Sequence, residues 1–232
     1  TSLMTLTGER VLSSHGISST IAWSQNGQPV HALEGNISVS GQSAAFMAEM
    51  LGLTDAAALS ELAETVPNSN GVSFVPALVG LGAPYWRSDA RGTLTGMSLG
   101  TKPAHLARAA IEAIAFQVSD VFSAMQRDIT VRLAELRADG GASQNGFLMQ
   151  FQADVLGRPV TTGDAPEVSA LGAAALAFAG LGIATSTVPE TKRYIPTINE
   201  NDRAAHLSRW HGAMAQTLHT QPQTGTNGGG LS

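Results

Sequence analysis

The feature that most constrains this chain is a short segment in which a strand pattern stops at two glycines and continues as a helix pattern. Residues 135–157 read ELRADGGASQNGFLMQFQADVLG. The first residues alternate as in a strand, Asp139, Gly140 and Gly141 form a turn, and apolar residues then recur at helical spacing. Such a turn leaves backbone N–H groups unpaired at the helix start, where an anion or a nucleotide can approach closely. We therefore predict the main ligand site of the chain at this turn.

Composition narrows the class of protein. The 232 residues suffice for one well-buried domain, and 43% of them are hydrophobic. The apolar runs are shorter than the roughly 18 residues of a membrane span, so no transmembrane segment is predicted. A net charge of −5 disfavours a nucleic-acid binder, and the absence of Cys excludes disulfides, thiolate metal sites and a Cys nucleophile. These properties favour a cytoplasmic protein that handles metabolites, without a nucleic-acid or membrane partner.

The first quarter of the chain is predicted to be an antiparallel meander. Gln25, Asn26 and Gly27 are typical of a hairpin turn between two strands. Because Thr1 opens directly into a strand pattern without an initiator Met, we expect a chain that begins inside a sheet. The predicted strands cover residues 2–7, 10–15, 18–24 and 28–33.

Helical spacing of apolar residues predicts the other main elements. Thr54 is the expected N-cap of one helix, and Thr101 that of a long central helix with Pro103 in its first turn. Pro166 is expected to begin a helix of very small residues, whose surface would let a flat ligand come near. Predicted helices are 42–51, 55–65, 101–125, the segment after 145, the segment from 166 and 201–218; predicted strands are 72–75, 93–97 and 158–161; residues 221–232 are predicted to be disordered.

Residues 76–92, PALVGLGAPYWRSDARG, form the longest irregular stretch. They combine two prolines, several glycines, adjacent aromatic residues and three charges. A loop of this length in a compact domain is either functional or held by its own side chains. We favour a packed structural loop, and direct contact with a ligand or a neighbouring subunit is the alternative.

Three glycine turns precede predicted helices, at Gly41, at Gly140 and Gly141, and at Gly163. One such turn alone is usually a plain chain reversal. The second turn is more informative because Asn145 follows it in the first turn of the helix, where its amide can meet the edge of an adenine. Asp139 is expected to cap the turn rather than to act as a base.

Candidate catalytic groups are scattered. Asp120, Asp128, Asp154 and Glu167 show no pairing with a basic partner, and solvated faces are their favoured interpretation. Of the six histidines, only His206 and His211 share a predicted helix, and at a spacing of five residues they would chelate a metal poorly; no Walker A loop is present. By spacing alone, the chain reads as a ligand-binding half without its own catalytic group or metal site.

Four segments resemble the C-terminal domain of the FGGY carbohydrate kinases, and within that family they look most like glycerol kinases. They occur in the family's order and are GVSFVPALVGLGAPYWRSDARGTLTGMS, ARAAIEAIAFQVSDVFSAM, ELRADGGASQNGFLMQFQADVLGRPV and SALGAAALAFAGLG. The resemblance covers residues 1–185. It implies an α/β fold, an actin-like ATPase (ribonuclease H-like) domain with a mixed β-sheet and flanking helices. Residues 1–220 would form this nucleotide-side domain, with 53–100 as a possible subdomain excursion.

The resemblance also implies site residues. The family's D-G-G-x-x-x-N segment lines the adenosine pocket and corresponds here to Asp139, Gly140, Gly141 and Asn145. Gly41 matches a glycine that approaches the nucleotide, and Ala45 stands where the family has a glutamine, which removes a polar contact. Near Ser2, glycerol kinases have an aromatic residue that packs on glycerol. Ser2 as a substrate-binding residue would suit a larger or more polar substrate, such as a tetritol, a pentitol or a ketose.

The family's catalytic aspartate and Mg²⁺-organising carboxylate belong to sequence that precedes Thr1 in an alignment. The resemblance therefore implies an ATP- and Mg²⁺-dependent kinase of a polyol or sugar, with the N-terminal half of the same kinase as partner and a possible homo-oligomer. No catalytic residue is assigned to this chain, which we expect to be inactive alone. The alternatives are a stand-alone nucleotide-binding or regulatory domain, and a structural protein of the actin class.

Overall fold

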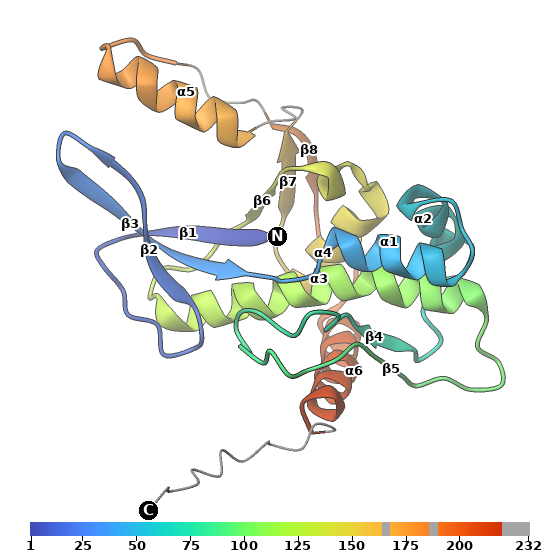
Figure 1. Ribbon diagram of the computed structural model, residues 1–232. Helices are drawn as coiled ribbons and strands as arrows, with labels where there is room; N and C mark the ends of the chain where they lie inside the picture. The colour runs from blue at the N-terminus through green and yellow to red at the C-terminus, as the bar shows by residue number, and fades with distance from the viewer. Residues whose placement is uncertain (164–167, 186–189, 220–232) are drawn as a thin grey trace, which may run out of the picture.

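The computed structural model describes residues 1–163, 168–185 and 190–219. Helix α3 (Pro103–Asp128) runs through the middle of the molecule, and the other elements are arranged around it (Figure 1). The long central helix predicted from the apolar spacing is thereby confirmed. Its N-cap is Lys102 and not Thr101: His105 Nδ1 accepts a hydrogen bond from the Lys102 N–H at 3.0 Å, whereas Thr101 Oγ accepts one from the Ser98 N–H.

The N-terminal sheet contains β1 (Ser2–Gly8), β2 (Ser18–Gln25) and β3 (Gln28–Asn36). Its order is β1-β3-β2, and both outer strands run antiparallel to β3. The predicted hairpin turn is confirmed, because Asn26 and Gly27 both have the positive φ that such a turn requires. A sequential meander is wrong, since β1 pairs with β3.

The predicted strand at residues 10–15 is also wrong. This segment is held by the end of α3 instead of by a sheet. The Asp128 carboxylate accepts a hydrogen bond from the Ser14 N–H at 3.1 Å and lies 2.6 Å from His15 Nδ1. These contacts to a residue more than 110 positions away cannot be read from local alternation.

Helices α1 (Gly41–Met50) and α2 (Ala56–Glu64) pack on α3. The N-cap of α2 is Asp55 and not Thr54, because Asp55 Oδ1 accepts hydrogen bonds of 2.9 Å from the N–H groups of Ala57 and Ala58. A two-stranded sheet follows, made of β4 (Ser73–Val75) and β5 (Thr93–Thr95).

The loop at residues 76–92 is packed and held by its own side chains. Tyr85 donates to Asp120 Oδ2 at 2.9 Å, and Trp86 Nε1 donates to the Gly16 carbonyl at 2.7 Å. Arg87 pairs with Asp89 within the loop at 2.7 Å. The favoured interpretation of a structural loop agrees with these contacts.

The last third of the chain forms a second three-stranded sheet and three helices. The sheet order is β6-β7-β8, with β6 parallel and β8 antiparallel to β7. Strand β8 lies within a stretch for which no strand was predicted. Helix α5 has no buried residue and stands apart from the other helices (Figure 1). The bounds are β6 (Leu136–Ala138), the 3₁₀ turn η1 (Gly141–Gln144), α4 (Gly146–Leu156), β7 (Val160–Gly163), α5 (Val168–Gly180), β8 (Glu190–Tyr194) and α6 (Glu200–His219).

Three carboxylates that were assigned to solvated faces are buried. Asp120 and Asp154 are each 7% exposed, and the Asp128 side chain is 3% exposed. Asp154 accepts a 2.6 Å hydrogen bond from the Thr197 N–H. The solvated interpretation is wrong for these three because their partners come from distant segments. Glu167, Pro166 and the predicted disordered tail at residues 221–232 lie outside the described residues.

No helix among the described residues combines the length and the apolar character that crossing a membrane would require.

Candidate functional site

A cavity of about 570 Å³ lies where α1, α2, α3 and the η1–α4 segment meet. It brings together Gly41, Gly141 and Asn145, three of the residues that the sequence predicted for one ligand site. Gly41 and Gly141 are 100 positions apart in the chain, so only the tertiary structure could show that they share a cavity. The other lining residues are Ala44, Ala56, Ala57, Ser60, Glu61, Glu64, Ile111, Ile114, Ala142, Gln144, Gly146 and Leu148.

The glycines leave open space beside the backbone. A Cβ atom added to Gly41, Gly140 or Gly141 would meet no other atom within 4 Å. Gly140 has a φ of +78°, which side chains other than glycine rarely adopt. The turn therefore has its sharp form because of Gly140, and Gly41 and Gly141 keep the backbone accessible to a ligand.

Asn145 fixes the geometry of the cavity wall. Its Oδ1 accepts a 2.9 Å hydrogen bond from the Leu148 N–H, which caps α4, and its Nδ2 donates to Ser60 Oγ on α2 at 2.8 Å. Asn145 is thus the N-cap of α4 rather than a residue of its first turn. Each amide atom retains capacity for one further hydrogen bond, which a ligand in the cavity could use.

A buried ion pair lies on α3, one of the helices that line the cavity. Arg108 Nε lies 2.8 Å from Glu112 Oε1, and the Glu112 side chain is only 2% exposed. Arg108 also donates to the Val66 carbonyl at the end of α2 and lies over the Phe147 ring, 4.3 Å from its centroid. The Arg108 guanidinium on α3 therefore contacts both α4 and the segment directly after α2.

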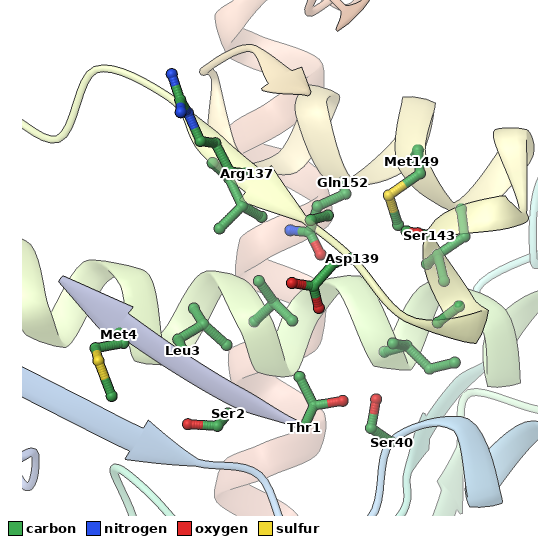
Figure 2. Close-up of a pocket in the computed structure, with 16 residues that line it drawn as sticks. Thr1, Ser2, Leu3, Met4, Ser40, Arg137, Asp139, Ser143, Met149 and Gln152 are labelled. Carbon is green, nitrogen blue, oxygen red and sulfur yellow. The ribbon is translucent and has the colours of Figure 1, made fainter. Parts of the chain in front are cut away.

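A second cavity of about 380 Å³ adjoins the first (Figure 2). Ile114, Ala142 and Leu148 line both cavities and form the wall between them. Figure 2 shows Asp139, directly after β6, and Ser40, directly before α1, on opposite sides of this second cavity. The polar lining consists of Thr1, Ser2, Ser40, Arg137, Asp139, Ser143 and Gln152.

Ser40 is a site residue that the sequence reasoning missed. It is 2% exposed, and within the described part of the chain its hydroxyl has no hydrogen-bond partner. A buried hydroxyl without a partner costs free energy unless a ligand or water satisfies it. The available signal was its place directly before Gly41, where serine is a favoured N-cap. Its side chain makes no capping bond and lines the cavity instead.

Ser2 and Asp139 lie in the second cavity, apart from Gly41 and Asn145. The Ser2 hydroxyl donates to Glu34 Oε1 at 2.9 Å. The expectation that Asp139 caps its own turn is wrong, because Ser143 closes the turn, with its N–H and hydroxyl both donating to the Gly140 carbonyl. Asp139 instead lines the second cavity.

Two further expectations concern what borders these cavities. Helix α5 was expected to form a wall beside the turn, but none of its described residues lines either cavity, because it stands away from α4. Among residues 1–163, 168–185 and 190–219, no group of three His, Asp or Glu side chains gathers in a metal-binding arrangement.

Comparison with known proteins identifies relatives of the chain. The model of the "FGGY family of carbohydrate kinases, C-terminal domain" matches residues 1–181. Glycerol kinase of Deinococcus radiodurans is 44% identical over 92% of this chain and 44% of its own length. Glycerol kinase 2 of Thermotoga maritima is 42% identical over 93% of this chain and 45% of its own length. The chain thus spans less than half the length of these relatives.

Solved structures give the same result for the fold. Glycerol kinase of Plasmodium falciparum, determined with ADP, superposes with a TM-score of 0.85 at 32% identity, over 94% of this chain and 45% of that one. Xylulose kinase of Lactobacillus acidophilus superposes with a TM-score of 0.81 at 22% identity, over 93% and 44%. The chain therefore has the mixed α/β, actin-like ATPase fold of these kinases, as predicted.

Proposed function

This chain belongs to the FGGY family of carbohydrate kinases, whose C-terminal domain it matches, and we propose that it is the nucleotide-binding half of an ATP-dependent polyol or sugar kinase. The observation that carries the proposal is the meeting of Gly41, Gly141 and Asn145 around one 570 Å³ cavity. Residues 1–220 would form this half, with 53–100 as a subdomain, in a cytoplasmic enzyme.

The first cavity suits the nucleoside part of ATP. Its walls include small and apolar residues together with glycine backbone and a few polar side chains, which resembles the usual composition of small-molecule sites; the polar side chains are those of Ser60, Glu61, Glu64, Gln144 and Asn145. Asn145 is positioned to bond a base edge because its side chain is already fixed by α2 and α4. The space beside Gly41 and Gly141 would then be occupied by the ligand.

The second cavity suits the phosphates and the substrate. The Ser40 hydroxyl, which has no partner among the described residues, can donate a hydrogen bond to a phosphate oxygen in this cavity. Mg²⁺ would neutralise phosphate charge during transfer. We propose Ser2 as a substrate contact that favours a substrate larger or more polar than glycerol. The catalytic base is assigned to the N-terminal half of the kinase.

Nucleotide binding can be tested with ADP and the chain itself. We expect weak binding by isothermal titration, and about tenfold weaker binding for Gly41→Val and Gly141→Val, because each side chain would fill the space beside the turn. Gly172→Val is the matched control, since its Cβ also meets nothing within 4 Å and Gly172 lines neither cavity. Equal affinities for all four proteins would contradict the proposal.

Catalysis is tested separately. The chain alone should produce no ADP from ATP with any polyol, because phosphoryl transfer needs the missing base and charge-neutralising groups. Measurable ADP production would overturn this assignment. In a complete enzyme, a substrate panel in which glycerol is preferred over tetritols, pentitols and ketoses would overturn the role of Ser2.

A further inference from the structure

Three arginines gather at the end of α4, away from the two cavities described above. Arg158 follows the C-cap of α4, Arg203 lies near the start of α6, and Arg132 precedes β6. None of the three lines either cavity. Because Asn145 caps the other end of α4, about 16 Å of helix separates the arginines from the nucleotide cavity. We call Arg132, Arg158 and Arg203 the arginine cluster.

The guanidinium of Arg158 is held in place by two backbone carbonyl groups. Its Nε donates to the Leu133 carbonyl at 3.2 Å, and its Nη1 donates to the Gly157 carbonyl at 2.7 Å. These bonds connect the segment before β6 with the end of α4 through a single cation. A guanidinium has five N–H groups, so three N–H groups of Arg158 remain for another acceptor.

Gly157 brings Arg203 against the same corner of the molecule. Gly157 ends α4 with a φ of +60°, and a Cβ atom added to it would lie 3.3 Å from both Cδ and Nε of Arg203. The glycine thus lets the Arg203 side chain lie directly against the backbone that Arg158 binds. Arg203 pairs with Glu200 through two nitrogens, at 2.9 and 2.5 Å, and the Glu200 side chain is 72% exposed. Solvent therefore weakens this ion pair.

Arg132 adds a third positive charge. It is exposed, and it makes no hydrogen bond or ion pair with the residues that the structure describes. Burial, and then the charges of Arg132 and Arg203, lower the pKa of the Arg158 guanidinium, whereas the charge of Glu200 raises it. Arginine keeps its proton in proteins, so the fold retains this repulsion. An anion among the three side chains would relieve it.

Two other carboxylates at these helix ends already have partners. Asp154, in the last turn of α4, accepts a 2.6 Å hydrogen bond from the Thr197 N–H. Asp202, in the first turn of α6, accepts a 2.8 Å hydrogen bond from the Asn199 amide. The arginine cluster with Glu200 therefore has three positive charges and one negative charge, in a chain whose net charge is −5.

We propose that the arginine cluster binds a phosphate group, either as free phosphate or as the phosphoryl group of a small metabolite. Guanidinium groups offer planar pairs of N–H donors, which match the oxygen atoms of phosphate. Arg132 and the remaining N–H groups of Arg158 would bind the phosphate oxygens, and Arg203 would divide its N–H groups between the phosphate and Glu200. Bound phosphate would thereby connect α4, α6 and the segment before β6.

Binding is measured on the chain at constant ionic strength, with sodium phosphate in place of sodium chloride. We expect about 10 mM phosphate to raise the Tm by about 3 °C, as a dissociation constant of about 1 mM implies. Glycerol 3-phosphate in a second arm distinguishes a phosphoryl group from free phosphate, and a rise with either one supports the proposal. The same Tm in phosphate, glycerol 3-phosphate and chloride overturns it.

A pair of arginine variants locates the phosphate. Arg132→Gln should lower the affinity for phosphate about tenfold, measured from the shifts of the arginine Nε–H resonances during titration. Arg132 makes no contact that the fold needs, and thermal unfolding without phosphate shows that the variant is folded. Arg10→Gln is the matched control, since it removes the same charge from another exposed residue. Equal affinities of the two variants would mean that phosphate acts as a general salt, and the proposal fails.

Two further variants distinguish this site from its neighbours. Glu200→Gln removes the carboxylate that competes for Arg203, so phosphate should bind about threefold more tightly, and weaker binding would contradict the proposal. Ser40→Ala alters only the second cavity and should leave phosphate binding unchanged. Loss of phosphate binding in Ser40→Ala would assign the phosphate to the second cavity and overturn the arginine cluster as its site.

Discussion

On one side of α3, Asp120 is surrounded by polar groups from two other parts of the chain, whereas on another side Ile114, Val118 and Phe122 line two cavities, of about 380 and 300 Å³, that β1 and β6 border. Asp120 accepts hydrogen bonds from Tyr85 at 2.9 Å and from Trp210 Nε1 at 2.7 Å, and His211 Nε2 lies 3.1 Å away. The chain satisfies the buried charge with its own residues. The apolar side borders the two cavities, so the two sides differ in how closely the rest of this chain packs against α3.

The difference between the two sides of α3 bears on the stability of the chain. Burial and the nearby Asp120 carboxylate raise the pKa of Tyr85, so the phenol stays protonated and donates its hydrogen bond. Trp210 is 1% exposed and stacks on Phe116, with ring centroids 5.2 Å apart. We infer that the Asp120 side contributes more to the stability of the chain than the side that borders the two cavities.

The largest expected effect tests the polar side. Asp120→Ala should lower the free energy of unfolding by about 3–5 kcal/mol, because it leaves buried donors of Tyr85 and Trp210 without an acceptor. Urea unfolding measures the loss. Asp120→Asn, which retains an acceptor oxygen, should lose less. A loss below about 1 kcal/mol for Asp120→Ala would show that the contacts of Asp120 do not make its side of α3 the more stabilising one.

A second buried carboxylate should show an intermediate effect. Glu112→Gln should cost about 2 kcal/mol in the same measurement, because Arg108 keeps its charge but loses its ionic partner. Glu49→Gln on the exposed part of α1 is the matched control and should change stability by less than about 0.5 kcal/mol. Equal effects of the two substitutions would mean that the ion pair between Arg108 and Glu112 does not stabilise the packing of α3 against its neighbours.

The pH-dependent part of stability that His211 contributes should be a smaller effect. The hydrogen bond to Asp120 raises the pKa of His211 above its usual value near 6.5, so its stabilising effect is complete below that value and is lost as pH rises through the raised pKa. The His211 side chain is 57% exposed, and solvent screening limits the effect to under about 1 kcal/mol.

The variant His211→Gln isolates this effect. The difference in unfolding free energy between the original chain and His211→Gln should be larger at pH 6 than at pH 8. The contribution of His206 to the pH dependence has the opposite sign, because burial lowers the pKa of His206 and acidification therefore destabilises the fold. His206 is present in both proteins, so its contribution cancels in the difference between them. A difference that does not change with pH would show that His211 does not sense Asp120.

The smallest effect is expected on β1, beside the two cavities. Met4→Ala and Leu6→Ala should each change the stability of the isolated chain by less than about 0.5 kcal/mol, since these side chains are 51% and 52% exposed. Leu33→Ala on the neighbouring strand is the control, and should cost about 2–5 kcal/mol because Leu33 is fully buried. Comparable losses at Met4 and Leu33 would mean that the side chains of β1 beside the cavities are already packed.

The sequence by itself determined the features that depend on neighbouring residues. Apolar repeats at three and four positions predicted α3, and Asn26-Gly27 predicted a hairpin because positive φ is a local property. The strand, glycine turn and helix around Gly140 were also predicted, although Asn145 proved to be the N-cap of α4. Gly41, Gly141 and Asn145 could be singled out individually for the same reason.

Only the tertiary structure decided which of these features meet and which charges are buried. Asp120 and Asp128 appeared solvated because their partners, Trp210 and His15, lie about 90 and 113 positions away. The β1-β3-β2 order, the free Ser40 hydroxyl and the cavities between β1 and β6 likewise arise from contacts across the chain. Local periodicity specifies an element and its apolar face, but the free energy of a buried charge or a strand edge depends on what packs against it.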